Sequence, residues 1–145
     1  MLTETIQLET LRQKIEDVSY EAGDKTDYLS YGKPSPVQAK QAKELIEKLN
    51  SQSKELRAEF KQLIATVRSQ QPQAFEEWIN YHMGMLQDIV DEKTTGKDAG
   101  TRKFVAKQTI QEWEKVRAGE QEYVNINWHY LKDYKADVRK IKGDV

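Results

Sequence analysis

The spacing of the apolar residues predicts an all-α fold, an elongated up-and-down helical bundle of four helices, or five if the final segment divides, two of them long. Apolar residues recur at steps of three and four along the chain, and no useful stretch alternates with the period of two that strands require. All three prolines and most of the seven glycines fall between these runs. A length of 145 residues predicts one helical-bundle domain over residues 1–145.

The first helix is expected over roughly residues 3–22, and a long loop should follow it. The apolar residues of this helix are spaced at three and four: Leu8, Leu11, Ile15, Val18 and Ala22. Gly23 suits the position just after a helix end. Residues 23–34 would then form the loop, with Tyr28 and Tyr31 packed over one end of the bundle or offered to a partner.

The second and third helices have clear start signals. Ser35 can cap the second helix, Pro36 suits its first turn, and Gln38 can complete a capping box. This helix should run to about residue 69, a length of roughly 51 Å at 1.5 Å per residue. Pro72 ends it and starts a third helix near residues 73–93, where Glu76 and Glu77 favour the positive end of the helix dipole.

The last segment, from Thr101 to residue 142, is predicted to be one long helix. Its apolar seam keeps a heptad register from Ala106 to Ile141, across Gly119. Glycine inside a helix costs about 1 kcal/mol relative to alanine, so a bend near residues 118–122 is expected there. Division into two helices is the alternative.

Composition and charge exclude several classes of function. The chain has no cysteine, which removes disulfides, thiolate metal sites and thiol nucleophiles. With 23 basic and 24 acidic residues, it has no overall attraction to nucleic acid or to an anionic membrane. It also has no apolar run of membrane-spanning length and no signal-peptide pattern, so a soluble, cytoplasmic protein is expected. Residues 76–92 carry acids and no base, whereas residues 127–142 are mainly basic.

A short repeat contains both histidines and suggests a metal site. The pattern isoleucine, asparagine, aromatic, histidine ends at His82 and again at His129, and Asp133 follows four residues after His129. If the two helices pack antiparallel, these three side chains would form a set that can bind zinc or iron. Di-iron bundles, however, use Glu-x-x-His pairs, and here isoleucine stands three residues before each histidine. Hydrogen-bonded core histidines are therefore the favoured interpretation, and no cofactor is expected.

Two basic segments are the remaining candidate binding sites. Residues 96–103 are glycine-rich and basic before a helix start, but they lack the Walker spacing, so a capping turn is favoured over a phosphate site. In the last helix, Lys132, Lys135 and Arg139 alternate with aromatic residues, a pattern that can grip single-stranded nucleic acid weakly. The acids among them make nucleic acid an unfavoured partner.

The sequence best fits a non-enzymatic helical module for protein–protein interaction, such as an adaptor, an assembly factor or a structural subunit. No serine or threonine stands in a recognisable nucleophile motif. Long helices with a narrow apolar stripe expose most of their surface, which suits a protein partner or a homo-oligomer. The expected contact residues combine aromatic and basic side chains: Tyr28, Tyr31, Lys132, Lys135 and Arg139.

Overall fold

The computed structural model describes residues 3–93, 96–132 and 134, and this part of the chain contains four helices and no strand. They are α1 (Thr3–Tyr31), α2 (Pro36–Gln70), α3 (Pro72–Val90) and α4 (Ala99–Ala118). The predicted all-α fold class is confirmed. No helix among the described residues is long and apolar enough to cross a bilayer.

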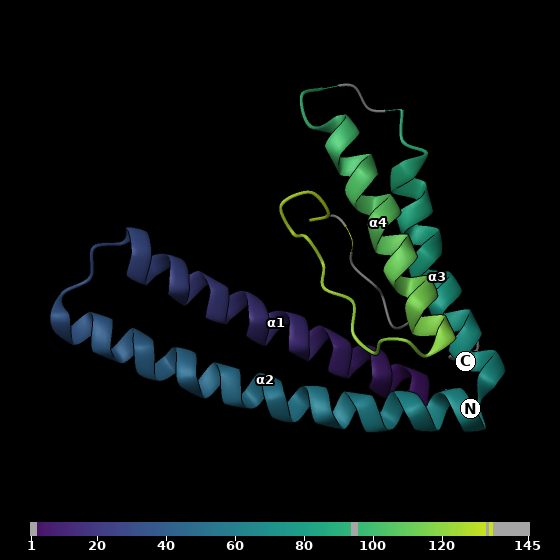
Figure 1. The fold of residues 1–145 in the computed structure, drawn as a ribbon, viewed down its shortest axis with the longest axis horizontal. Coiled ribbons are helices and arrows are strands. Elements are labelled where there is room, and N and C mark those ends of the chain that lie inside the picture. Colours follow the sequence, from purple (N-terminus) through teal and green to yellow (C-terminus); the bar gives the residue numbers. More distant parts are fainter. Residues whose placement is uncertain (1–2, 94–95, 133, 135–145) are drawn as a thin grey trace.

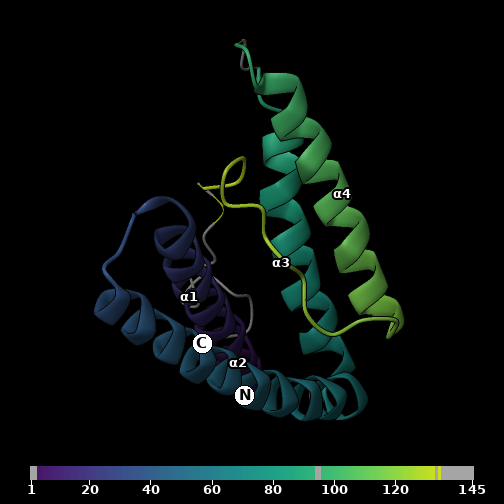
Figure 2. The same cartoon turned by 60° about the vertical axis from the view of Figure 1, so that its left-hand side comes forward.

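The helices form two hairpins that diverge from a shared corner (Figure 1). Helix α1 packs along α2 and α3 packs along α4, while the contacts between the hairpins run from α3 to α2 and α1. Only Gln71 separates α2 from α3, and this short link places the corner there. After α4 the chain runs back between the hairpins (Figure 2). We call this segment, residues 119–132 and Tyr134, the strap.

Helix α1 is longer than its sequence pattern predicts. The expected loop over residues 23–34 is wrong, because α1 continues through Gly23 to Tyr31. Ala22 and Leu29 stay half-buried along α1, so the stripe that packs on α2 extends past the glycine. A glycine inside a helix costs only about 1 kcal/mol, which this packing offsets. The two long helices are therefore α1 and α2.

Helix α2 begins as predicted. The Ser35 hydroxyl accepts a hydrogen bond from the Gln38 backbone N–H at 3.2 Å, and the Gln38 side chain accepts one from the Ser35 backbone N–H at 3.0 Å. This reciprocal pair satisfies backbone donors that a helix start leaves free. Local sequence alone is sufficient to define this boundary.

Helix α4 ends at Gly119, so the predicted continuous helix across this glycine is wrong. Gly119 has a left-handed φ of 82°, and the following N–H of Glu120 donates to the carbonyl of Lys115 at 2.9 Å. From α2, Arg68 donates to the Val116 carbonyl at 2.9 Å and thus satisfies the helix end. The heptad register does not continue the helix because Arg117 and Glu120 in its seam offer no apolar surface to bury.

The core lies where the two hairpins and the strap meet. Its largest buried apolar side chains come from every element: Trp78, Trp113, Tyr134, Phe60, Leu8, Ile15, Ile64, Ile79, Leu86 and Leu131. By contrast, residues 19–55 are all described and include only two buried side chains, Ala42 and Leu49. These outer halves of α1 and α2 extend beyond the core in Figure 1, and we call them the arm.

Candidate functional site

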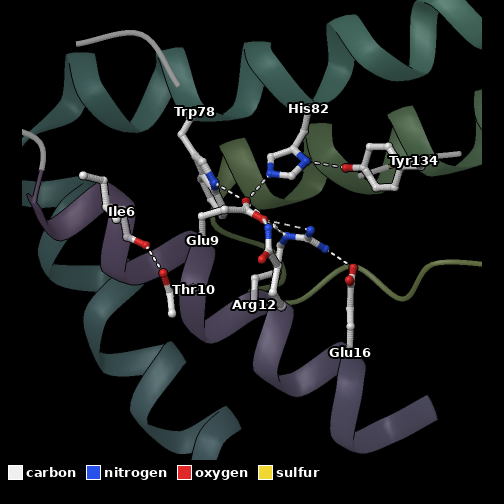
Figure 3. Close-up of polar contacts among 9 residues, drawn as sticks. Ile6, Glu9, Thr10, Arg12, Glu16, Trp78, His82 and Tyr134 are labelled. Carbon is white, nitrogen blue, oxygen red and sulfur yellow. Dashed lines mark hydrogen bonds and ion pairs between the residues drawn. The ribbon is translucent and has the colours of Figure 1, made fainter. Parts of the chain in front are cut away.

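A buried polar cluster joins α1 to α3 and to the strap (Figure 3). Glu9, Arg12 and Glu16 stand at steps of three and four, which places them on one face of α1. Glu9 is 0 % exposed and Arg12 is 1 % exposed. The sequence pattern does not indicate this cluster, because acid–base–acid spacing is also that of an ordinary solvent-exposed helix face.

The Glu9 carboxylate lies at the centre and accepts hydrogen bonds at both oxygens. Oε1 accepts from the Trp78 indole N–H at 2.9 Å and contacts His82 Nε2 at 2.5 Å. Oε2 pairs with Arg12 Nη2 at 2.8 Å and accepts from Gln13 Nε2 at 3.0 Å. Because these donors come from α1 and α3, the carboxylate connects the two hairpins.

The charges of the cluster are set by burial and by pairing. Burial alone would raise the pKa of Glu9, but His82 and the Arg12 guanidinium hold that pKa well below its usual range. Burial alone would lower the pKa of Arg12, but Glu9 and other neighbours hold it above its usual value. Arg12 also pairs with Glu16, whose own pKa burial raises. Glu9 and Arg12 thus form a charged pair inside the protein.

His82 connects this pair to the strap. Burial lowers the pKa of His82, so the ring is neutral at pH 7. The hydrogen-bond network assigns its proton to Nε2, which donates to Glu9, while Nδ1 accepts from the Tyr134 hydroxyl. The ring also stacks on Trp113 with centroids 4.2 Å apart. His82 therefore makes the hydrogen bonds of a core histidine, the interpretation that the sequence favours over metal binding.

The structure describes two of the three predicted metal ligands, His82 and His129, and these two have different surroundings. Both ring nitrogens of His82 are engaged, whereas His129 is exposed on the strap and its ring contacts Tyr130. Asp133 lies outside the described residues. Within the described ranges, no three His, Cys, Asp or Glu side chains are arranged to hold a metal ion. A site formed by His82, His129 and Asp133 stays a prediction.

The expected basic last helix is wrong where the structure describes it. Lys132 lies in the strap, which has no helix there, and Lys135 and Arg139 lie outside the described residues. The acidic stretch 76–92 is partly neutralised by α4. Glu76 pairs with Arg117 at 2.8 Å, and Glu92 pairs with Arg102 at 3.0 Å.

The arm carries most of the exposed large apolar side chains. Of the five on the described residues, four belong to the arm: Tyr20, Tyr28, Tyr31 and Val37. Tyr20 is 65 % exposed and Tyr31 is 82 % exposed, whereas Tyr28 is 36 % exposed, so the expected packing over the bundle end is wrong for Tyr31. The exposed rings of Tyr20 and Tyr31 can contact another molecule.

The tyrosines share a face of α1 with acidic residues. Steps of four, three and four align Tyr20, Asp24, Asp27 and Tyr31, and we call the exposed surface of these residues and Tyr28 the tyrosine face. Residues 16–31 contain five acids and one base. At its inner end lies a hollow of about 790 Å³, lined from two sides by Glu16, Asp17, Tyr20, Trp128, His129 and Lys132.

Comparison with known proteins adds no relative to these observations. The chain matches no protein-family model, no curated protein and no solved structure.

Proposed function

We propose that this protein is a non-enzymatic helical interaction module, an adaptor, assembly factor or structural subunit, and that it binds a protein partner through the arm. The observation that carries the proposal is the extension of the arm beyond the core, with four of the five exposed large apolar side chains of the described residues. Buried aromatic side chains supply much of the binding energy in protein interfaces. The arm presents three tyrosines before any partner is bound.

The energetics of the arm support a binding role. Fixing the backbone of one residue costs about 1–2 kcal/mol, whereas burying one aliphatic side chain returns about 1.5–3 kcal/mol. Residues 19–55 fully bury only Ala42 and Leu49, so a residue of the arm gains less from packing than a residue of the core. A partner that covers the exposed tyrosines would add apolar burial where the arm has least.

The buried cluster supports a structural role, as the base from which the arm extends, and does not support catalysis. Glu9 and His82 are 0 % exposed, and their polar atoms bind one another, Trp78 and Tyr134. A general acid or base must reach the proton of a substrate, and a closed cluster prevents this. We place the binding role in the cytoplasm because the sequence has no cysteine for an oxidising compartment.

Affinity capture with matched variants tests the proposal. Tagged wild-type protein, Tyr20→Ala/Tyr31→Ala and Phe104→Ala are used as baits, and captured proteins are identified by mass spectrometry. Phe104 is exposed on α4, outside the arm, and is the control. We expect a partner, or a second copy, to be retained by wild type and Phe104→Ala and lost from the double variant. Equal capture by all three baits would reject the arm as the interface.

Light scattering separates the two forms of the proposal. If the partner is a second copy, wild-type protein should form a dimer or larger species at micromolar concentration, and Tyr20→Ala/Tyr31→Ala should shift it to monomer. A monomeric wild type excludes self-association and leaves a different protein as the partner.

A further inference from the structure

The hollow between α1 and the strap has the size and the lining of a ligand site. Its volume of about 790 Å³ lies within the roughly 300–1,000 Å³ of pockets that bind small ligands. Glu16, Asp17 and Tyr20 line it from α1, where steps of four and three to Tyr20 place the three side chains on one edge of the helix. Trp128 and His129 line it from the strap. Two carboxylates therefore stand beside three aromatic rings in one concave site.

The Glu16 carboxylate has the capacity to bind a further cation. Its side chain is 8 % exposed, and among the described residues its one partner is Arg12, at Oε1. In that part of the chain, Oε2 has no hydrogen-bond donor. Burial raises the pKa of Glu16, because Arg12 compensates the buried negative charge only in part. A second cation in the hollow would complete this compensation.

The aromatic side chains of the hollow suit a planar cation. An arginine guanidinium stacks on aromatic faces, and its fork of N–H donors pairs with carboxylates through two bonds. Trp128 is half-buried in the strap and Tyr20 is 65 % exposed, so both rings can contact a group that enters the hollow. Lys132 also lines the hollow and repels a cation, so its removal should strengthen the binding of one.

The charge of the neighbouring surface favours a basic protein segment as the source of this cation. Residues 16–31 of α1 contain five acids and one base. Two copies of this chain that paired their tyrosine faces would set Asp24 and Asp27 against acids in a parallel or an antiparallel pair, because the steps of four, three and four are symmetric. Like charges across an interface suppress such a pairing. Charge complementarity therefore favours a different protein, with arginine on its surface, over a second copy.

We propose that the hollow between α1 and the strap binds an arginine side chain of the protein partner, within a basic segment that lies on the acidic tyrosine face. The guanidinium stacks on Trp128 and pairs with Glu16 and Asp17. The source of the arginine rests on the function proposed above. The affinity of the hollow for a guanidinium does not, because it needs no partner.

Titration of the full chain with an arginine probe, followed by NMR, tests the guanidinium site. The probe is N-acetyl-arginine methylamide, and its uncharged analogue N-acetyl-citrulline methylamide is the matched control. The chain has three tryptophans, and Trp128→Phe identifies the indole N–H signal that belongs to the hollow. The signals of Trp78 and Trp113 are internal controls, because both side chains are buried in the core. Sodium chloride at equal concentrations corrects for ionic strength.

We expect the arginine probe to shift the Trp128 signal saturably and the citrulline analogue to bind several-fold more weakly. Asp17→Asn should weaken probe binding about 5-fold, the effect of a unit charge roughly 4 Å away in water. Lys132→Ala should strengthen it by a similar factor, whereas Asp88→Asn, at an exposed position of α3, should leave it unchanged. No saturable shift, equal binding of the two probes, or weaker binding by Lys132→Ala would overturn the guanidinium site.

Capture with the same variants tests the source of the arginine. Asp17→Asn should retain several-fold less partner than Asp88→Asn, and Lys132→Ala should retain at least as much as wild type. Full retention by Asp17→Asn, together with loss from Tyr20→Ala/Tyr31→Ala, would overturn the partner's arginine in the hollow and leave the arm as the interface. Probe binding without any captured partner would count against the binding function of the arm and not against the guanidinium site.

Discussion

Glu9→Gln is the sharpest perturbation of the buried cluster. The substitution keeps the shape of the side chain but replaces one acceptor oxygen with an NH₂ donor, so either the Trp78 side or the Arg12 side loses its acceptor. Removing one partner of a buried pair costs about 3–5 kcal/mol. Glu16 still faces Arg12, so we expect the lower end, about 3 kcal/mol, out of the roughly 5–15 kcal/mol that domains have.

Urea unfolding followed by tryptophan fluorescence measures this loss. Trp78 and Trp113 are both buried around the cluster and report its disruption directly. With a urea slope of about 1–3 kcal/mol per molar, a loss of about 3 kcal/mol lowers the midpoint by roughly 1–3 M. Glu21→Gln, at an exposed position of α1, is the control and should leave the midpoint unchanged. A midpoint for Glu9→Gln equal to that of the control would refute a buried, fully bonded carboxylate.

Two further predictions concern pH and helix ends. Burial lowers the pKa of His82 below 6.5, so under pH 6.5 the unfolded chain binds a proton that the folded chain lacks, and stability falls by at most about 1.4 kcal/mol per pH unit. The urea midpoint of the wild type should fall as the pH is lowered from about 7.5 to about 5.5, and the midpoint of His82→Gln should fall less steeply. Burial raises the pKa of Glu16, which favours the folded state as the pH falls, but this effect is present in both proteins and does not change the comparison. Parallel slopes would contradict this. Gly119→Ala, at a φ of 82°, should destabilise by about 1–2 kcal/mol, whereas Gly23→Ala, with open space inside α1, should stabilise by about 0.5–1 kcal/mol in thermal unfolding. Shifts of the same sign would contradict the assigned helix ends.

The two glycines show where prediction from sequence stops. Gly23 suits a helix end and Gly119 lies within a continuous heptad register, yet α1 runs through Gly23 and α4 stops at Gly119. The difference comes from packing. Half-buried Ala22 and Leu29 carry the α1 stripe past Gly23, while Arg68 reaches from α2 to the Val116 carbonyl near the end of α4. In both contacts the partner is α2, which lies outside the local sequence of the glycine.

The candidate functional residues also divide into those that the sequence indicates and those that it does not. The sequence indicates Tyr28 and Tyr31 as partner contacts, and the structure exposes Tyr31 strongly and Tyr28 partly, on a helix and not in a loop. Glu9 and Arg12 escaped prediction because their spacing is that of a surface pair. They are buried because α3 and the strap bring Trp78, His82 and Tyr134 to them from about 70 or more residues away.

Local signals in the chain were enough for the all-α class, for the capped start of α2 and for the break at Pro72, because capping bonds and proline geometry act within four residues. Tertiary structure alone decided that α1 is long and that α4 stops at Gly119, which polar face is buried and what His82 binds. Those outcomes depend on burial and on hydrogen-bond partners far apart in sequence, since a helical pattern specifies which residues share a face but not what covers that face.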